Sequence, residues 1–480
     1  MNVLWLLILL PVAAAIACAL TGERLATAIA RATATVSAAL TTLVALSTPI
    51  GASATLPWLP QRGLHFALAL DALAIPGILT VAWTSALACA HARGKKLGLL
   101  LAAQACALVA WLAADLGTMV AAWSLLALLA ALMVSRSRQS VLAVFLPLSA
   151  AALALMCAAL LLALSHHEAT LGHWSFGLQK TLTVLSPAPQ EAMIAAFSLV
   201  AAWFMAGLWP LHGWWQSAAL AAPPAFGAWL PAVLRPLGIG LLVRVTLPAA
   251  AASMATMAST LGIVGALILI VGLLGASSEP VARRRYLHLA HVPTAVALIG
   301  VATFAAEGIG GALLLGLAGG LAFALVHLAG PPKRPFGTLL TTVGLLGLLG
   351  APGLLGFAAV LPIALALLGP TTWMLSGAAA LGLLLLGAVA IGIAPLIASA
   401  RDLQVNDEAA SPSRHSPRRA GLLALAAGLL VLLGVMPSLV QDRVNAAAPP
   451  LVHRAIKRWC ESELSPLLRA REAGINPTTE

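Results

Sequence analysis

The residue that most strongly suggests chemistry is Arg235, which interrupts the apolar stretch GAWLPAVLRPLGIGLLVR between Pro231 and Pro236. A charged side chain placed in lipid costs about 2.5 to 3.5 kcal/mol on insertion scales, so such a residue usually has a function. Each proline also lacks an amide donor and leaves a carbonyl that a guanidinium can bind. We therefore expect either an ion-path residue or a structural arginine that pairs with carbonyls or a neighbouring subunit. Arg244, near the end of the same stretch, is expected to extend toward the membrane surface.

Five further side chains are candidates for an ion path because they can take up or release a proton. His288 and His291 lie one helical turn apart, and an imidazole titrates close to neutral pH. A histidine that bonds to backbone or water near the basic end of a helix explains His288 equally well. The other candidates are His212, His327 and Glu307.

The elements that position these residues are predicted to be membrane-spanning helices. The chain has 480 residues, of which 61% are hydrophobic and 9% charged, whereas soluble domains average about 25% charged residues. Apolar runs of about 20 residues recur along the whole chain, and helices satisfy their own backbone groups in lipid. We predict an all-α polytopic membrane protein of about fourteen transmembrane helices, with the first helix retained rather than cleaved. The predicted spans are 3–20, 26–48, 68–90, 97–113, 117–134, 140–164, 193–216, 226–246, 254–276, 286–304, 309–330, 336–367, 372–398 and 418–440.

Two of these spans, the seventh and the twelfth, contain helix breakers. The seventh carries Pro210 in GLWPLHGWWQ, and the twelfth carries Gly350 and Pro352 in LLGAPGLLGF. Broken helices at corresponding places in two halves of a chain indicate an inverted-repeat transporter whose breaks line a polar cavity. A simple proline kink is the alternative for each span taken alone.

The charge distribution predicts the orientation. Lysines and arginines concentrate in the loops after odd-numbered helices, as in Arg24, Lys95 and Arg284, while Arg62 and Lys180 are the basic residues of the other loops. Such loops are usually cytoplasmic, so we expect both termini outside, in the periplasm of a bacterium with the chain in its inner membrane. The net charge of +11 follows from this topology and favours lipid headgroups rather than nucleic acid as partners. The five cysteines show no metal-binding spacing, and we expect no cofactor and no metal.

Four stretches, in order along the chain, resemble one membrane protein family. They are PWLPQRGLHFALALDALAIP (57–76), PLHGWWQSAALAAPPAFGAWLPA (210–232), VARRRYLHLAHV (281–292) and GLLGLLGAPGLLGFAAVLPI (344–363). These are similar to stretches of the antiporter-like membrane subunits of respiratory complex I and of the related Mrp antiporters. The resemblance implies fourteen helices with two inverted five-helix repeats and broken helices 7 and 12. On that pattern residues 1–96 hold helices 1–3, 97–246 the first repeat, 254–398 the second, and 399–480 a loop, helix 14 and a tail.

The family passes protons along a central chain of Glu, Lys and His residues, and this sequence lacks most of them. His288 falls on the family's histidine position, and Arg235 lies within one residue of an eighth-helix lysine found in some members. Arginine is a poor proton relay because it does not release its proton at accessible pH. The positions of the other family charges are occupied by Ser124, Met205, Ala322 and Val360.

Three functions remain open from the sequence. The first is a membrane subunit of a complex I-like ion-translocating assembly, at most a non-redox part of an NADH:quinone oxidoreductase-like translocase, with a degenerate proton path. The second is an ion-driving or scaffold subunit of an inorganic-carbon uptake complex. The third is a transport-inactive structural paralogue. All three predict the lipid bilayer and other membrane subunits as partners.

Overall fold

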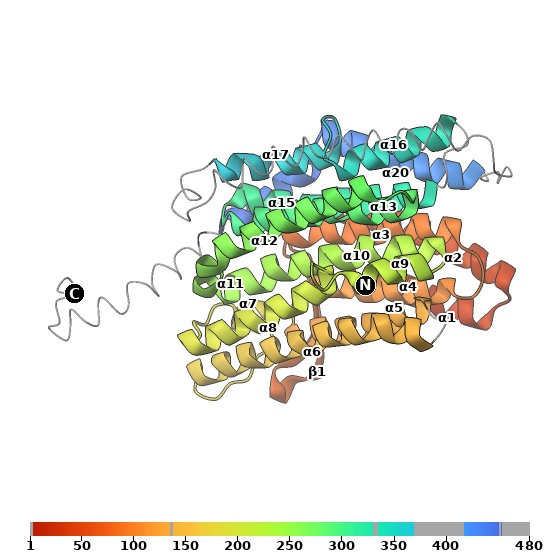
Figure 1. Ribbon diagram of the computed structural model, residues 1–480. Coiled ribbons are helices and arrows are strands. Elements are labelled where there is room, and N and C mark those ends of the chain that lie inside the picture. Colours follow the sequence, from red (N-terminus) through yellow and green to blue (C-terminus); the bar gives the residue numbers. More distant parts are fainter. Residues whose placement is uncertain (1–2, 135–137, 330–334, 369–416, 451–452, 454–480) are drawn as a thin grey trace.

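The computed structural model describes residues 3–134, 138–329, 335–368, 417–450 and 453, which form a bundle of helices lying side by side (Figure 1). In this part of the chain nine helices are long and apolar enough to cross a membrane, or ten if the bent pair Arg419–Val435 and Ser438–Pro450 is one span. The predicted thirteenth span, 372–398, and the tail beyond residue 453 lie outside the described residues. The prediction of a polytopic helical membrane protein is confirmed.

Seven helices form between residues 3 and 181, and all except α4 and α7 are long enough to cross a membrane. They are α1 (Val3–Leu20), α2 (Glu23–Ser47), α3 (Ile75–His91), α4 (Leu97–Leu112), α5 (Leu116–Val134), α6 (Arg138–Ala169) and the short α7 (Leu178–Thr181). Large apolar side chains are exposed on α1, α2 and α6, for example Leu20, Leu43 and Leu146. An outer face of this kind fits contact with lipid tails.

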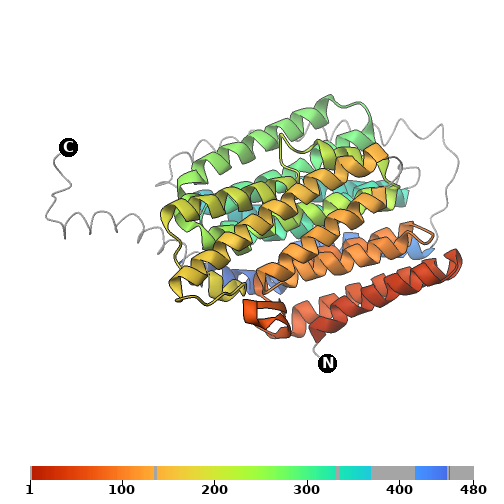
Figure 2. The same ribbon diagram turned by 90° about the horizontal axis from the view of Figure 1, so that it is seen from below.

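One stretch predicted to begin a helix forms a β-hairpin instead. We expected the third span to start at residue 68, but β1 (Ser53–Leu59) and β2 (Leu64–Ala69) pair antiparallel, and α3 begins only at Ile75. Gly63 makes the turn possible, because its φ of 67° is left-handed and a Cβ there would lie 2.2 Å from the carbonyl oxygen of Trp174. The hairpin stands beside the start of α1 at one end of the bundle (Figure 2).

The two predicted helix breaks are both present. The seventh span divides into α8 (Ala188–Ala206) and α9 (Gly213–Ala221), and the twelfth into α16 (Pro335–Leu348) and α17 (Leu355–Leu367). Gly207 ends α8 with a positive φ, and Gly350 and Gly353 do the same in the second break. The tenth span also divides, at Ala290, into α13 (Ala282–Leu289) and α14 (His291–Ala302), which the sequence analysis did not predict.

The remaining described elements complete the bundle. They are α10 (Pro224–Leu241), the π-helical turn η3 (Leu242–Thr246), α11 (Leu247–Ala249), α12 (Ala251–Ser278), α15 (Ala306–Ala329) and α20 (Pro417–Val435), together with the single turns η1 (Pro60–Arg62) and η2 (Ala72–Ala74). Despite Pro231 and Pro236, α10 continues without a break.

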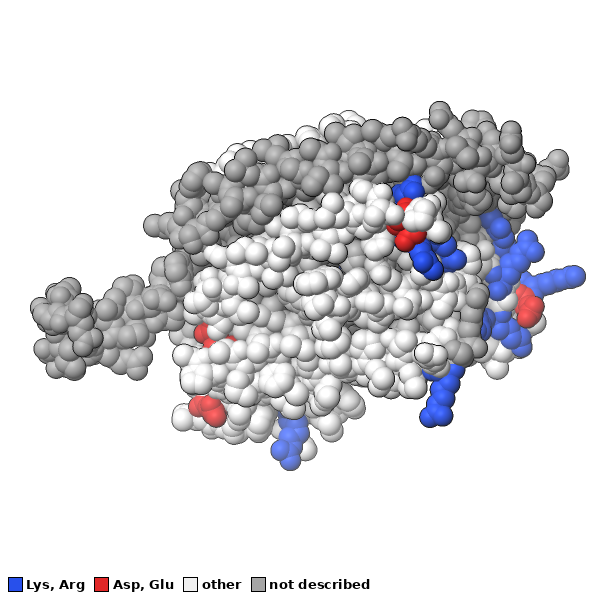
Figure 3. All heavy atoms as spheres, viewed as in Figure 1, with Lys and Arg blue, Asp and Glu red and all other residues white. Residues whose placement is uncertain are grey.

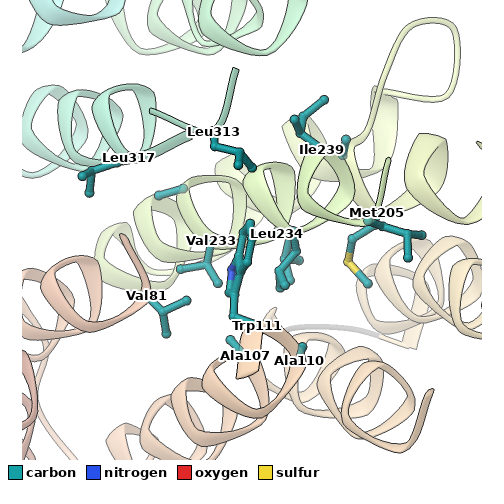
Figure 4. Packing of buried hydrophobic residues seen from close by; sticks show 14 of the residues in the cluster. Val81, Ala107, Ala110, Trp111, Met205, Val233, Leu234, Ile239, Leu313 and Leu317 are labelled. Atoms are coloured by element: carbon teal, nitrogen blue, oxygen red, sulfur yellow. The ribbon is translucent and has the colours of Figure 1, made fainter. Parts of the chain in front are cut away.

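The centre of the bundle is formed by α3, α10 and α15, which are almost entirely enclosed by other helices. Trp111 of α4 fills the space between α3 and α10, where a Cβ on Gly77 or Gly240 would lie 2.1 and 2.3 Å from its ring. Figure 4 shows Trp111 beside Val233 and Leu234 of α10. Small residues at these contacts let the backbones approach closely, as is usual in membrane bundles.

Charged side chains gather at the ends of the bundle. On the face shown in Figure 3, lysines and arginines cluster mainly at one end, and few charged side chains lie between the two ends. Arg244 is 5% exposed, and its guanidinium binds Asp71 Oδ2 through Nη2 at 2.6 Å and through Nε at 3.0 Å. The sequence could not reveal this partner because it lies 173 positions away.

A third arginine ties the C-terminal part of the described chain to its N-terminal part. Arg443, on the segment Ser438–Pro450, donates hydrogen bonds to the carbonyl oxygens of Ala45 at 2.8 Å, Thr48 at 3.2 Å and Leu46. These carbonyls end α2 and have no partner within the helix, so the cation satisfies them and complements the helix dipole.

Candidate functional site: a buried arginine and histidine cluster

Arg235 lies at the middle of α10 and is 3% exposed. Its Nη1 donates a hydrogen bond of 2.6 Å to the carbonyl oxygen of Ala290, the residue at which α13 gives way to α14. Its guanidinium carbon lies 4.5 Å from the centre of the Trp215 ring on α9, within the range of a cation–π interaction. The cation is therefore held by the carbonyl at a helix break and by an aromatic face. No carboxylate among the described residues pairs with it.

His291 completes the centre of the cluster. It begins α14, is 3% exposed, and its Nδ1 lies 3.5 Å from Nη2 of Arg235. Because a guanidinium can only donate, Nδ1 is the acceptor, and the neutral ring carries its proton on Nε2. The structure places the amide nitrogen Nε2 of Gln216 3.2 Å from Nε2 of His291. Turning this amide by 180° would put its oxygen there, where it could accept the Nε2 proton.

Two further rings extend the cluster along α9. The His212 ring, just before α9, meets the His291 ring edge-on at 5.1 Å between centroids, and the Trp215 ring meets His291 at 5.2 Å. His212 is partly exposed and its Nδ1 has no hydrogen-bond partner among the described residues. The seventh-span break thus places one candidate histidine beside another.

The candidate residues divide into two groups. Arg235, His291 and His212 come together, whereas His288 faces α12, where a Cβ on Gly275 would lie 2.6 Å from its Nδ1. Glu307 is exposed at the start of α15, and His327 lies in the last turn of the same helix. The two residues are about 30 Å apart, as follows from the rise per residue of an α-helix. Both ring nitrogens of His327 lack partners in the described residues, and its ring lies 5.4 Å from that of Phe323.

The positions that resemble the family's charged sites are uncharged and largely packed. Met205 of α8 and Ala322 of α15 are 0% exposed. Val360 is partly buried, and Ser124 is exposed on α5, where its hydroxyl donates to the carbonyl oxygen of Val120 at 2.9 Å. None of these four side chains can exchange a proton in the manner of a carboxylate or an amine.

Trp215 and Gln216 are site residues that the sequence pattern alone did not indicate. Both lie in GWWQ directly after the seventh-span break, so the spacing of polar and aromatic residues behind Pro210 could have indicated them. Their roles depend on α9 lying against α10 and on the start of α14, a long-range arrangement that local pattern does not show.

A cavity of about 30 Å³ adjoins the cluster. It is lined by α10, the start of α14 and the glycine-rich face of α15, and Arg235 and Thr294 are its polar side chains. A space of this size accommodates one or two water molecules. The arrangement therefore places a desolvated cation beside a small internal space.

Comparison with known proteins gives the family relationship. No protein-family model matches the chain. The NAD(P)H-quinone oxidoreductase chain 4 1 of Synechococcus sp. (strain JA-3-3Ab) is 28% identical over 371 residues, covering 71% of this chain and 69% of the relative. The protein of the same name from strain JA-2-3B'a(2-13) is 27% identical over 369 residues, covering 71% and 68%.

Solved structures share the fold. A chain of respiratory complex I from Thermus thermophilus with bound NADH superimposes with a TM-score of 0.84 at 21% identity, covering 95% of this chain and 100% of that one. A chain of the Mrp complex from Dietzia sp. DQ12-45-1b gives a TM-score of 0.78 at 20% identity, covering 99% of this chain and 57% of that one. In sequence this chain is similar to chain 4 of NAD(P)H-quinone oxidoreductase, and it shares its fold with antiporter-like membrane subunits of complex I.

Proposed function

We propose that this chain is a membrane subunit of a complex I-like ion-translocating assembly and that its own central axis carries little or no proton current. The observation that supports this most is the content of the axis. A fixed cation, Arg235, lies at its middle, and buried Met205 and Ala322 occupy positions where the family carries ionisable groups.

The physical reason is that a proton relay needs groups that exchange protons at accessible pH. Arg235 keeps its proton, so it cannot pass one on. His291 is the titratable group beside it, but its acceptor nitrogen faces the guanidinium. Protonating that nitrogen would remove this contact and place two positive groups against each other with no carboxylate among the described residues between them.

The proposal includes the finer architecture expected for the family. We propose fourteen helices arranged as two inverted repeats, with both termini on the periplasmic side of a bacterial inner membrane. The cluster of basic residues at one end of the bundle supports this orientation. The paired breaks of the seventh and twelfth spans support the repeats.

A partner-capture experiment tests the assembly. The tagged chain is purified in mild detergent from its native membrane, with an unrelated tagged polytopic protein as the control, and partners are identified by mass spectrometry. Redox subunits together with a second antiporter-like subunit that retains the Glu and Lys residues support the proposal. A large zinc-binding partner resembling a carbonic anhydrase would instead favour inorganic-carbon uptake, and the absence of any stable partner would refute both assemblies.

A flux experiment tests the second part. The chain is reconstituted alone into liposomes containing a pH-sensitive dye, and a potassium diffusion potential drives proton entry. We expect the same rate as in protein-free liposomes, with gramicidin as the positive control. A clear excess rate that Arg235→Gln abolishes would show that the axis conducts.

A further inference from the structure

Arg235 has no counter-charge in the described part of the chain, and this distinguishes it from the other buried arginine of the same span. Arg244 pairs with Asp71, whereas the oxygen that Arg235 binds is a neutral carbonyl. The Nε of Arg235 is buried and has no hydrogen-bond partner among the described residues. A buried ion is costly unless an opposite charge or a full set of hydrogen bonds compensates it.

The cavity beside Arg235 has the size and lining for a small anion. Its volume of about 30 Å³ suits a single halide ion or one or two waters. The hydroxyl of Thr294, which is 8% exposed, joins the guanidinium as a potential donor to this space. The other lining side chains are aliphatic, aromatic, proline or glycine, so no lining side chain repels an anion.

A helix end adds hydrogen-bond donors to the site. Ala290, Pro293 and Thr294, which surround the N-terminus of the twelve-residue α14, line the cavity together with Arg235. The first turn of a helix carries amide donors without partners inside the helix, and these can bind an anion. Here Pro293 has no amide, and the negative end of α13, which meets α14 at Ala290, offsets the helix dipole. Glycines allow α15 to close the space, since a Cβ on Gly319 would lie 2.7 Å from Pro293.

We propose that this cavity binds a small monovalent anion of chloride size, which serves as the counter-ion of Arg235 and is held by the guanidinium, Thr294 and the first turn of α14. The site lies between α10 and α15, which are largely enclosed by other helices of this chain. This inference is independent of the proposed function, because it requires no ion translocation.

The test is thermal unfolding of the full-length chain in detergent micelles at constant ionic strength, with gluconate replaced stepwise by chloride or bromide. We expect a saturable rise in Tm of about 2 to 4 °C for the natural chain. Arg235→Gln should abolish the rise, and Arg235→Lys should retain it at higher halide concentrations. Arg244→Gln is the matched control, since it removes another buried arginine and should leave the halide response in place.

A second variant protects the test against misfolding of Arg235→Gln. Thr294→Val keeps the shape of the side chain and should raise the half-saturating chloride concentration by about fivefold, the loss of one hydrogen bond. Chloride-35 NMR line broadening that bromide competes away, in the natural chain, would support the site independently. If halides do not raise the Tm of the natural chain, the cavity holds water only. If folded Arg235→Gln responds to halides as the natural chain does, any bound anion lies elsewhere. Either result overturns the proposal.

Discussion

Removing the charge of Asp71 should destabilise the fold through Arg244, although Asp71 lies at the edge of the bundle. The side chain of Arg244 is 4% exposed and that of Asp71 is 38% exposed. Asp71→Asn keeps the oxygen that accepts the hydrogen bond from the Ala74 amide, but it leaves the buried guanidinium without an anion. Breaking a fully buried pair costs about 3 to 5 kcal/mol, and the exposure of Asp71 reduces this to about 2 kcal/mol.

A double-mutant cycle isolates the interaction. Asp71→Ala should cost about 1 kcal/mol more than Asp71→Asn, because it also removes the cap on the Ala74 amide. Arg244→Met combined with Asp71→Asn should show a coupling free energy of about 1 to 2 kcal/mol. The free energy of unfolding is measured by titrating SDS into micelles and following the fluorescence of the thirteen tryptophans. Additivity within about 0.5 kcal/mol would refute the pairing.

Four other substitutions have defined outcomes. Trp111→Ala should lower the free energy of unfolding by about 3 to 5 kcal/mol in the same titration. Gly240→Ala should also destabilise the fold, because its Cβ would overlap the Trp111 ring. An unchanged midpoint for either variant would contradict the packing of Trp111 between α3 and α10. Arg443→Ala should expose the segment around it to limited proteolysis while the rest of the bundle stays resistant, since its bonds to the end of α2 are lost. Burial raises the pKa of Asp115 above its ordinary value of 3.8, although hydrogen bonds from three backbone amides lower it. The folded state therefore holds the carboxyl proton more tightly than the unfolded state does. This contribution to stability is present at low pH and is lost as the pH rises through the folded pKa. Unfolding measured from about pH 3 to pH 6 should lose this part of its slope in Asp115→Asn, and an identical slope would argue against the shift.

Local pattern was sufficient for the elements that depend on composition and on helix breakers. Apolar length predicted the spanning helices to within a few residues, and Pro210 and the Gly350 segment predicted both broken spans. The hairpin was missed because the segment 64–70 reads as a continuous apolar run, and only the turn at Gly63 separates it into a strand.

The sequence predicted a buried charge at the candidate site but not the residues that contact it. An arginine within an apolar span is visible in any sequence, but its contacts with Ala290 and Trp215 depend on how three helices pack. The break at Ala290 brings His291, rather than His288, to the guanidinium. The spacing of the two histidines gives no signal that selects His291 for this contact.

The hydrogen bonds of Arg443 have a consequence for the order in which the protein matures. The carbonyls at the end of α2 leave the ribosome early in synthesis, whereas the arginine that binds them is made about 400 residues later. Until then the pair of helices α1 and α2 must lie in the bilayer with the C-terminal end of α2 open to water or to lipid headgroups. The bond therefore forms only when nearly the whole chain has been inserted, and it joins the first part of the protein to be made to one of the last.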